Sequence, residues 1–309
     1  MINALSVDVE DWFHVQALSR VIDRSNWDDI PLRVEASTQR LLDLFDRRSV
    51  KATFFILGWV AQRRAQLVRR IQAAGHEIAS HGMTHELVFN QSPAQFRAQT
   101  RDAKALLEDI TGVRCLGYRA STYSITRRSL WALDVLCELG FAYDSSIFPI
   151  RHDVYGIPDA ATRPGLLRAP SGAQLVEFPM STVDYGPVRL PVSGGGYFRL
   201  LPYALTRAGL QRLNHREQRP FVFYLHPWEV DPAQPRVAAS WLSRLRHYIN
   251  LQRCEARLDR LLGEFAMAPM AQVLQSLSLL PASATQTPGG QPQPLPAPRQ
   301  PAVADPLVA

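Results

Sequence analysis

The chain has 309 residues and a formal net charge of +6, and its 46% hydrophobic residues suffice for one large domain with appendages. No run of about 18 apolar residues occurs, and the first residues lack the pattern of a signal peptide, so we expect neither a transmembrane helix nor export. Three scattered cysteines without CxxC spacing argue against disulfides and against a thiolate metal site, and they favour the cytoplasm.

Short β-rich runs alternate with amphipathic helical patterns through the first two thirds of the chain. We expect strands at residues 3–9, 51–58, 77–82, 115–119, 141–146 and 220–227. We expect helices at residues 37–48, 60–75, 92–112 and 129–140. Ser37 or Thr38 would cap the first helix, and Ser92 the third, with Pro93 in its first turn. Repeated strand–helix units of this length imply parallel strands joined by right-handed crossovers.

Polar and reactive side chains fall at the C-terminal ends of several of these strands. They are Asp8, His81, Arg119, Asp144 and His226. An open doubly wound sheet and a TIM-like barrel both fit the alternation, but a barrel collects residues from many strand ends into one mouth. We therefore predict an α/β fold of the irregular, TIM-like (β/α)7-8 barrel type.

The later segments are less regular. Residues 150–219 are rich in Gly and Pro and are expected to form loops and short strands over the mouth, and residues 238–266 are expected to form one late helix. From Pro281 onward the composition is dominated by Pro, Gly, Gln and Ala, which cannot bury enough apolar surface to become ordered. We predict one domain over residues 1–280 and a disordered tail over residues 281–309.

The segment "SHGMTH" places His81 and His85 four residues apart. On a helical turn this spacing points both imidazoles the same way, and neutral imidazole is a good ligand for Zn²⁺ and similar ions. The segment "DVEDWFH", residues 8–14, offers carboxylates as a third ligand. Two histidines and one carboxylate leave a position open for water, which is typical of a catalytic metal site.

A metal would also explain why three carboxylates crowd together in "DVEDWFH". One of them can bind the cation, while a second remains ionised beside it and takes a proton from the metal-bound water. His14, in the same segment, has no role that the sequence suggests.

Three further strand-end residues complete the candidate site. His226, in "YLHPWE", could act as a general acid that protonates a leaving group. Arg119, in "GYRAS", could hold a catalytic carboxylate ionised and in the correct rotamer. Asp144, in "YDSS", could do the converse for a neighbouring cation or bind substrate.

The segments "SVDVED", "SHGMTH", "GYRAS", "YDSS" and "YLHP" resemble, in order and rough spacing, the five motifs of the polysaccharide deacetylase family, the NodB-homology carbohydrate esterases. The resemblance covers roughly residues 3–265. The segments "DVEDWFH", "DSSIFP", "GGGYFRLLP" and "LHPWEVDP" look more narrowly like the deacetylases of exopolysaccharide loci in bacteria with PEP-CTERM sorting systems. The family implies a deformed barrel, a divalent metal held by an Asp-His-His triad, and hydrolysis of N-acetyl groups on amino sugars.

The resemblance implies a role for five residues. Asp8 corresponds to the general base, His81 and His85 to metal ligands, Arg119 to the arginine that orients the base, and His226 to the general acid. The segment from about residue 230 would be specific to the narrower group.

The chain departs from the family pattern in two places. The usual first motif has two adjacent aspartates, base and then ligand, whereas here Val9 separates Asp8 from Glu10 and Asp11. Strand alternation puts Asp8 and Glu10 on one face, but a turn after Val9 would favour Asp11, so both remain candidate ligands. The usual Arg-x-Pro of the third motif is "RAS" at residues 119–121, which affects the expected substrate contacts more than catalysis.

The sequence therefore predicts a metal-dependent polysaccharide de-N-acetylase that uses zinc or, alternatively, Co, Ni or Mn. The expected substrate is a glycan containing N-acetylhexosamine, such as an exopolysaccharide or its lipid-linked precursor, with Tyr123, Asp144 and Trp228 as contacts. No nucleic-acid motif occurs, while the basic charge fits peripheral association with the inner face of the membrane or with the synthesis machinery. The alternatives are hydrolysis of another C–N bond, as in a deformylase or cyclic amidase, and an inactive carbohydrate-binding scaffold.

Overall fold

A curled, mainly parallel β-sheet with helices packed around it forms the centre of the molecule. The computed structural model describes residues 1–186 and 188–282, so the predicted tail lies outside the described residues from 283 onward. The sheet has nine strands in this part of the chain, in the order β10-β1-β2-β3-β4-β5-β7-β6, and β11 pairs with β1. The strands are β1 (Asn3–Val9), β2 (Thr53–Ile56), β3 (Glu77–Ser80), β4 (Gly117–Tyr118), β5 (Tyr143–Asp144), β6 (Gly165–Arg168), β7 (Gln174–Glu177), β10 (Val222–Leu225) and β11 (Met267–Ala268).

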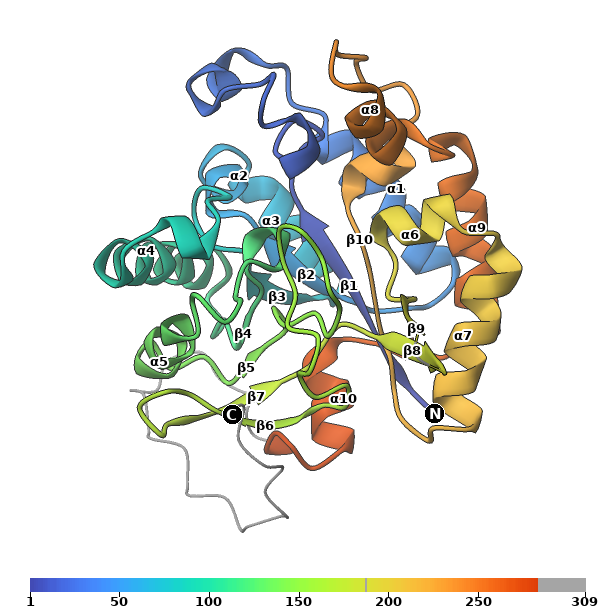
Figure 1. Ribbon diagram of the computed structural model, residues 1–309. Coiled ribbons are helices and arrows are strands. Elements are labelled where there is room, and N and C mark those ends of the chain that lie inside the picture. Colours follow the sequence, from blue (N-terminus) through green and yellow to red (C-terminus); the bar gives the residue numbers. More distant parts are fainter. Residues whose placement is uncertain (187, 283–309) are drawn as a thin grey trace.

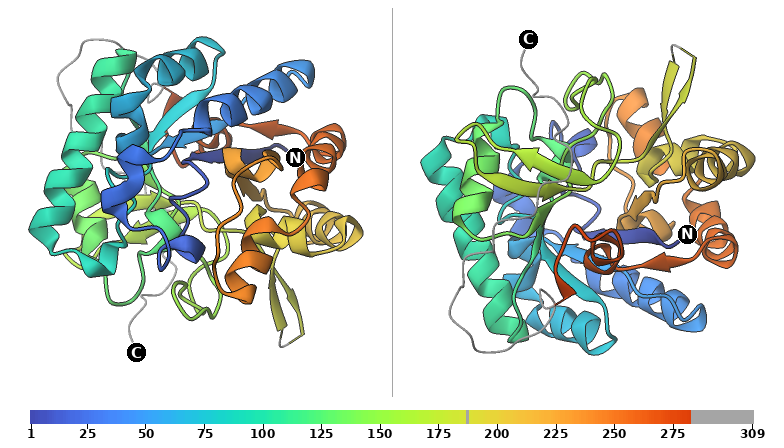
Figure 2. Two further views of the ribbon diagram at one scale, coloured as in Figure 1. Left: turned by 90° about the horizontal axis from the view of Figure 1, so that it is seen from above. Right: turned by 90° about the horizontal axis from the view of Figure 1, so that it is seen from below.

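The sheet forms an incomplete barrel. Its strands run parallel except β6, which pairs antiparallel with β7, and within the described residues β6 and β10 end the ladder without pairing with each other. Seen along the barrel in Figure 2, the strands curve around a centre with helices outside. The structure therefore confirms the predicted deformed barrel rather than an open doubly wound sheet.

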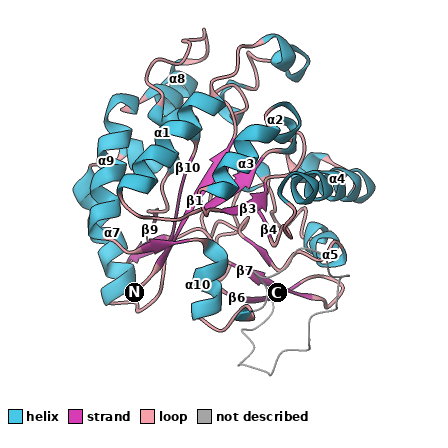
Figure 3. Ribbon diagram, turned by 180° about the vertical axis from the view of Figure 1, so that it is seen from behind, coloured by secondary structure: helices cyan, strands magenta, loops and turns pink. Residues whose placement is uncertain are grey.

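Helices cover the outside of the sheet and one end of it (Figures 1 and 3). They are α1 (Val34–Arg47), α2 (Gly58–Arg63), α3 (Ala65–Ala73), α4 (Pro93–Thr111), α5 (Trp131–Glu138), α6 (Gly195–Leu200), α7 (Tyr203–His215), α8 (Trp241–Tyr248), α9 (Leu251–Glu264) and α10 (Met270–Ser276). The short α10 lies at the end of the barrel opposite the C-terminal ends of β1 and β10. No helix in the described ranges is long and apolar enough to span a bilayer.

Two of the predicted helices are each divided in two, and one segment predicted as loops and short strands also contains a long helix. The helix expected over residues 60–75 breaks at Arg64, whose φ of −137° is not helical, into α2 and α3. The late helix over 238–266 is divided at Asn250, which adopts a left-handed φ of 52°, into α8 and α9. The segment over 150–219 contains the 13-residue helix α7 in addition to short strands and the hairpin β8 (Thr182–Tyr185)–β9 (Val188–Pro191). Helical periodicity does not reveal a break that tertiary packing imposes.

The register of the parallel strands aligns the candidate residues at one edge. Val7 pairs with Leu225, so Asp8 and His226, the next residues of each strand, lie side by side. Ser80 pairs with Tyr118, which similarly brings His81 and Arg119 together. The ends of the strands therefore build one mouth, as expected of a barrel.

Close packing between β4 and β5 supports this mouth from below. A Cβ atom on Gly117 would lie 2.1 Å from Cζ of Tyr143. The Tyr143 ring is fully buried and its hydroxyl donates to Glu77 Oε1 at 2.8 Å, so it has no room to move. Glycine is thus required at this position by contact rather than by backbone conformation.

Gly117→Ala should destabilise the protein by about 3 kcal/mol, because the added methyl group overpacks the core. Gly165→Ala is the matched control, since a Cβ there meets no atom within 4 Å. Urea unfolding would measure both, and equal unfolding midpoints would contradict the packing argument.

Candidate functional site

Glu10, His81 and His85 form a buried cluster of potential metal ligands at the mouth of the barrel. One ligand atom from each residue lies within 4.8 Å of the others. Glu10 Oε2 and His85 Nε2 lie 2.5 Å apart. Two of the three residues follow strands directly, Glu10 after β1 and His81 after β3. His85 comes from the loop after β3 and has a left-handed φ of 54°, which is uncommon for a residue other than glycine.

The chemistry of these three side chains fits a divalent cation. His81 Nδ1 donates to the Arg119 carbonyl at 2.9 Å, which leaves the Nε2 lone pair free, as is usual for metal-binding histidines. Burial lowers the pKa of His81 to about 4, so its ring is neutral near pH 7. Glu10 Oε2 is buried and faces His85 Nε2 at 2.5 Å, and within the described ranges it has no other polar partner. Two imidazoles and a carboxylate are a typical donor set for zinc and related ions.

Charge compensation keeps Glu10 ionised. Burial acts to raise the pKa of its carboxyl group, but His85 and His226 outweigh it and hold that pKa below its usual range. An anionic ligand is therefore available without a proton having to be displaced.

The neighbouring Asp11 points elsewhere. Its Oδ2 accepts hydrogen bonds from the backbone N–H groups of Arg33 at 2.7 Å and Val34 at 2.8 Å, at the start of α1. Its Oδ1 accepts from the N–H of Trp12 at 2.9 Å. A carboxylate at a helix N-terminus satisfies free N–H groups and complements the helix dipole. This geometry favours Glu10 over Asp11 as the carboxylate ligand.

The same contact replaces the helix cap expected from the sequence. We predicted Ser37 or Thr38 as the cap, but α1 begins one turn earlier at Val34, and Asp11, 23 residues away in the chain, binds its first N–H groups. His14, which had no predicted role, accepts the Asp11 N–H through Nδ1 at 2.9 Å and so fixes this turn.

Asp8 and Arg119 form a buried ion pair beside the metal-binding cluster. Arg119 Nη1 donates to Asp8 Oδ1 at 2.6 Å and to Ser6 Oγ at 2.8 Å. Its Nε and Nη2 donate to the carbonyl and hydroxyl oxygens of Ser145. Burial acts to lower the pKa of Arg119, yet the Asp8 carboxylate raises it overall, so the guanidinium stays charged. One carboxylate oxygen of Asp8 is thereby fixed while Oδ2 faces His226.

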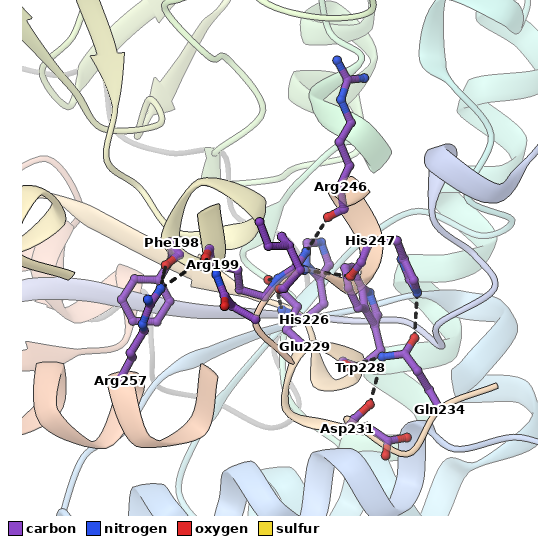
Figure 4. Close-up of polar contacts among 12 residues, drawn as sticks. Phe198, Arg199, His226, Trp228, Glu229, Asp231, Gln234, Arg246, His247 and Arg257 are labelled. Atoms are coloured by element: carbon purple, nitrogen blue, oxygen red, sulfur yellow. Dashed lines mark hydrogen bonds and ion pairs between the residues drawn. The ribbon is translucent and has the colours of Figure 1, made fainter. Parts of the chain in front are cut away.

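His226 faces both carboxylates at the end of β1. Its Nε2 lies 3.4 Å from Glu10 Oε1 and 3.9 Å from Asp8 Oδ2. Its Nδ1 donates to Glu229 Oε1 at 2.8 Å (Figure 4). Burial acts to lower the pKa of His226, but Glu10 and Glu229 raise it to about 9. The structure thus combines a carboxylate and a protonated imidazole within one mouth.

The three predicted substrate contacts differ in position. Trp228 stacks on the His226 ring with centroids 5.2 Å apart, and its Nε1 lies 3.5 Å from Glu10 Oε1. Tyr123 is buried, with its ring 5.2 Å from that of Tyr224. Asp144 is fully buried below the mouth, where it accepts from Ser146 Oγ at 2.5 Å and burial raises its pKa to about 6. Its position favours a structural role rather than substrate contact.

Glu229 was missed by the sequence interpretation. The signal available was its spacing in "HPWE", since residues i and i+3 meet on a single 3₁₀ turn, here η5 (Pro227–Val230). Its carboxylate accepts both the backbone N–H and the ring Nδ1–H of His226.

The fold and this site define a class: a deformed barrel with a buried carboxylate, an imidazole and a candidate metal centre at its C-terminal mouth. Residues 25–143 match the family model described as polysaccharide deacetylase, and residues 145–275 match one described as a domain of unknown function, DUF3473. The crystal structure of a Mycobacterium smegmatis protein named after the polysaccharide deacetylases superposes with a TM-score of 0.59 at 20% identity, covering 94% of this chain and 93% of that one. That likeness shows the fold.

Sequence relatives agree with the family model. YheN of Bacillus subtilis, also named after the polysaccharide deacetylases, is 35% identical over 105 residues, which cover 33% of this chain and 36% of that protein. A chitooligosaccharide deacetylase of Bradyrhizobium is 30% identical over 99 residues, covering 32% of this chain and 43% of that protein. The chain therefore spans less than half the length of these relatives. Together the family model and the relatives show that residues 25–143 are similar to polysaccharide deacetylases.

Glu10→Gln and Asp11→Asn separate the two candidate ligands. We expect Glu10→Gln to weaken Zn²⁺ binding by at least about 100-fold, because a direct ligand is lost. Asp11→Asn should bind Zn²⁺ normally but lose about 1 kcal/mol of stability, because the α1 cap is weakened. Isothermal titration and urea unfolding would measure the two effects, and the opposite pattern would make Asp11 the ligand.

Proposed function

We propose that this protein is a metal-dependent hydrolase that removes N-acetyl groups from the amino sugars of a polysaccharide and releases acetate. The main support is the juxtaposition at one mouth of Asp8 and His226, with Oδ2 and Nε2 3.9 Å apart, beside the cluster Glu10, His81 and His85. A base, an acid and a cation site within this distance are the groups that amide hydrolysis requires.

Each side chain has a separate task in this reaction. A divalent cation held by Glu10, His81 and His85 would supply Lewis-acid activation of the attacking water and of the amide carbonyl. Asp8, held by Arg119 through Oδ1, accepts the proton of the attacking water on Oδ2. His226 is protonated at neutral pH, because its pKa is about 9, and it donates the Nε2 proton to the departing amine.

The proposed metal is zinc, with Co, Ni or Mn as alternatives. Two imidazoles and one carboxylate are a frequent zinc donor set in hydrolases, although geometry and availability also decide which metal is bound in the cell.

The proposed substrate is an exopolysaccharide or its lipid-linked precursor, made in the cytoplasm by a system of the PEP-CTERM-associated type. The chitooligosaccharide deacetylase among the relatives supports a substrate of linked N-acetylhexosamines. The stacked rings of Trp228 and His226 at the mouth provide a planar surface of the kind that sugar rings pack against.

We also propose that α8 attaches the protein to an anionic membrane surface. Its outer face carries Trp241, 76% exposed, with Leu242 and Leu245 at 39% and 45%. Arg244 and Arg246 are exposed on the same eight-residue helix, which contains no acidic residue. Figure 1 shows α8 at the same end of the barrel as the C-terminal ends of β1 and β10. Exposed Trp and Leu beside arginines are typical of interfacial helices that bind anionic lipid.

Asp8→Asn and His226→Ala should each lower kcat for acetate release by about 10²- to 10⁴-fold, because a proton-transfer group is removed. Both variants should stay folded and bind Zn²⁺. The assay measures acetate from N-acetylglucosamine oligomers. Undiminished activity would contradict the assigned roles, and formate or a ring-opened acid as the product would identify a different C–N hydrolase.

Trp241→Ser with Leu245→Ser should abolish co-sedimentation with phosphatidylglycerol vesicles, because the inserting side chains are lost. Leu277→Ser is the control and should bind normally, because Leu277, 39% exposed, directly follows α10 at the opposite end of the barrel. Trp241 also reports directly, since the other five tryptophans are buried or half-buried. Binding should therefore shift its emission to the blue and shield it from acrylamide. Unchanged binding by the double variant, or equal binding to neutral vesicles, would contradict the proposal.

A further inference from the structure

A buried ion pair behind His226 has no role in the mechanism described so far. Arg199 of α6 and Glu229 of η5 are each 1% exposed, and Arg199 Nε donates to Glu229 Oε2 at 2.6 Å. The other carboxylate oxygen, Oε1, accepts from the backbone N–H of His226 at 3.0 Å and from its Nδ1–H at 2.8 Å. One carboxylate therefore bridges the guanidinium and the proposed general acid (Figure 4).

The Arg199 guanidinium is fixed by the end of a helix. Its Nη1 donates to the carbonyls of His247 at 2.7 Å and Ile249 at 3.1 Å, and its Nη2 donates to that of Arg246 at 3.2 Å. These are C-terminal carbonyls of α8, which have no partner inside the helix and carry its partial negative charge. The Arg199 guanidinium thus has acceptors on two sides, the Glu229 carboxylate and the carbonyls at the end of α8. These contacts fix its position.

A stacked column holds the imidazole from its face. The Trp228 ring lies between the rings of His226 and His247, with centroid distances of 5.2 and 4.4 Å and interplanar angles of 22° and 21°. His247 Nε2 pairs with Gln234 Oε1 at 2.6 Å. The column restrains the tilt of the His226 ring, and Glu229 restrains its rotation about the Cβ–Cγ bond.

A pair this deeply buried is retained at a cost. The free-energy cost of removing two charges from water is offset only when the geometry of the ion pair is good. Apolar residues of similar volume often stabilise a protein equally well. Arg199 holds Glu229 ionised: burial acts to raise the pKa of the carboxyl group, but Arg199 and His226 lower it to about 2. An ionised carboxylate accepts hydrogen bonds only, so it accepts the Nδ1–H and leaves Nε2 to face the mouth.

We propose that Glu229 and Arg199 are positioning residues for His226, which hold its Nδ1–H in a hydrogen bond and aim its Nε2–H at the leaving group. The inference rests on the proposed function and extends it to the segment 145–275, whose matching family model carries no function. That segment contains Arg199, His226 and Glu229, and its strand β10 pairs with β1 next to Asp8. Its role is to supply the proposed general acid, His226, together with the two residues that position it, Glu229 and Arg199.

The test compares Glu229→Gln and Arg199→Ala with Arg257→Ala. Arg257 is the matched control, because its Nη1 also donates into α6, to the carbonyls of Phe198, Arg199 and Leu201, but does not bind Glu229. We expect kcat to fall by about 10²-fold in the first two variants, with KM and Zn²⁺ affinity unchanged, because a misaligned acid affects only proton transfer. Arg257→Ala should lose stability but retain kcat.

Two further measurements distinguish positioning from general destabilisation. Millimolar guanidinium should restore part of kcat in Arg199→Ala and none in His226→Ala. In proton NMR, the hydrogen-bonded Nδ1–H of His226, assigned by its absence in His226→Ala, should disappear in Glu229→Gln and shift in Arg199→Ala. Unchanged kcat, or a loss of kcat that follows the unfolded fraction, would overturn the proposal. If the wild type releases no acetate but shows these NMR changes, the proposed function fails and the positioning role stands.

Discussion

The burial of two carboxylates at the end of one strand is the constraint on which the rest of the site depends. Asp8 and Glu10 are each 2% exposed. An isolated buried carboxylate costs several kcal/mol, so each must have a compensating cation or donor. Asp8 is compensated by Arg119, and Glu10 by the histidines around it. The register of the neighbouring parallel strands places these partners at the same level along the barrel as the two carboxylates.

The third carboxylate, Asp11, does not share these partners, because the chain changes direction before it. The chain turns sharply after β1, where the Glu10 N–H donates to the Asp8 carbonyl at 3.0 Å, and Asp11 then points to the start of α1. Three adjacent acidic groups thus have three different partners: a guanidinium, a pair of imidazoles and a helix N-terminus. Because each carboxylate has its own partner, residues 8–14 can hold three acidic side chains without strong mutual repulsion.

The two parts of the chain that match different family models meet in this site. The first part contributes His81, His85 and Arg119, whereas the second contributes His226 and the groups behind it. The strand β1, which precedes both matched segments, lies between β2 and β10 and joins the two halves. Neither half holds both the candidate metal ligands and the candidate acid. We therefore regard the barrel as one functional unit.

Local pattern determined much of this protein. The alternation of strands and helices, the barrel class, and the strand-end positions of Asp8, His81, Arg119 and His226 follow from hydrophobic periodicity and from the residue types at the ends of apolar runs. Tertiary structure decided what periodicity does not contain. Only the tertiary structure distinguishes Glu10 from Asp11. The two residues are adjacent in the chain, but Glu10 lies with the histidines whereas Asp11 binds the start of α1. Only the packing of α6 against η5 brought Arg199 to Glu229, 30 residues apart, because the pairing of a buried charge depends on which elements meet and not on their order in the chain.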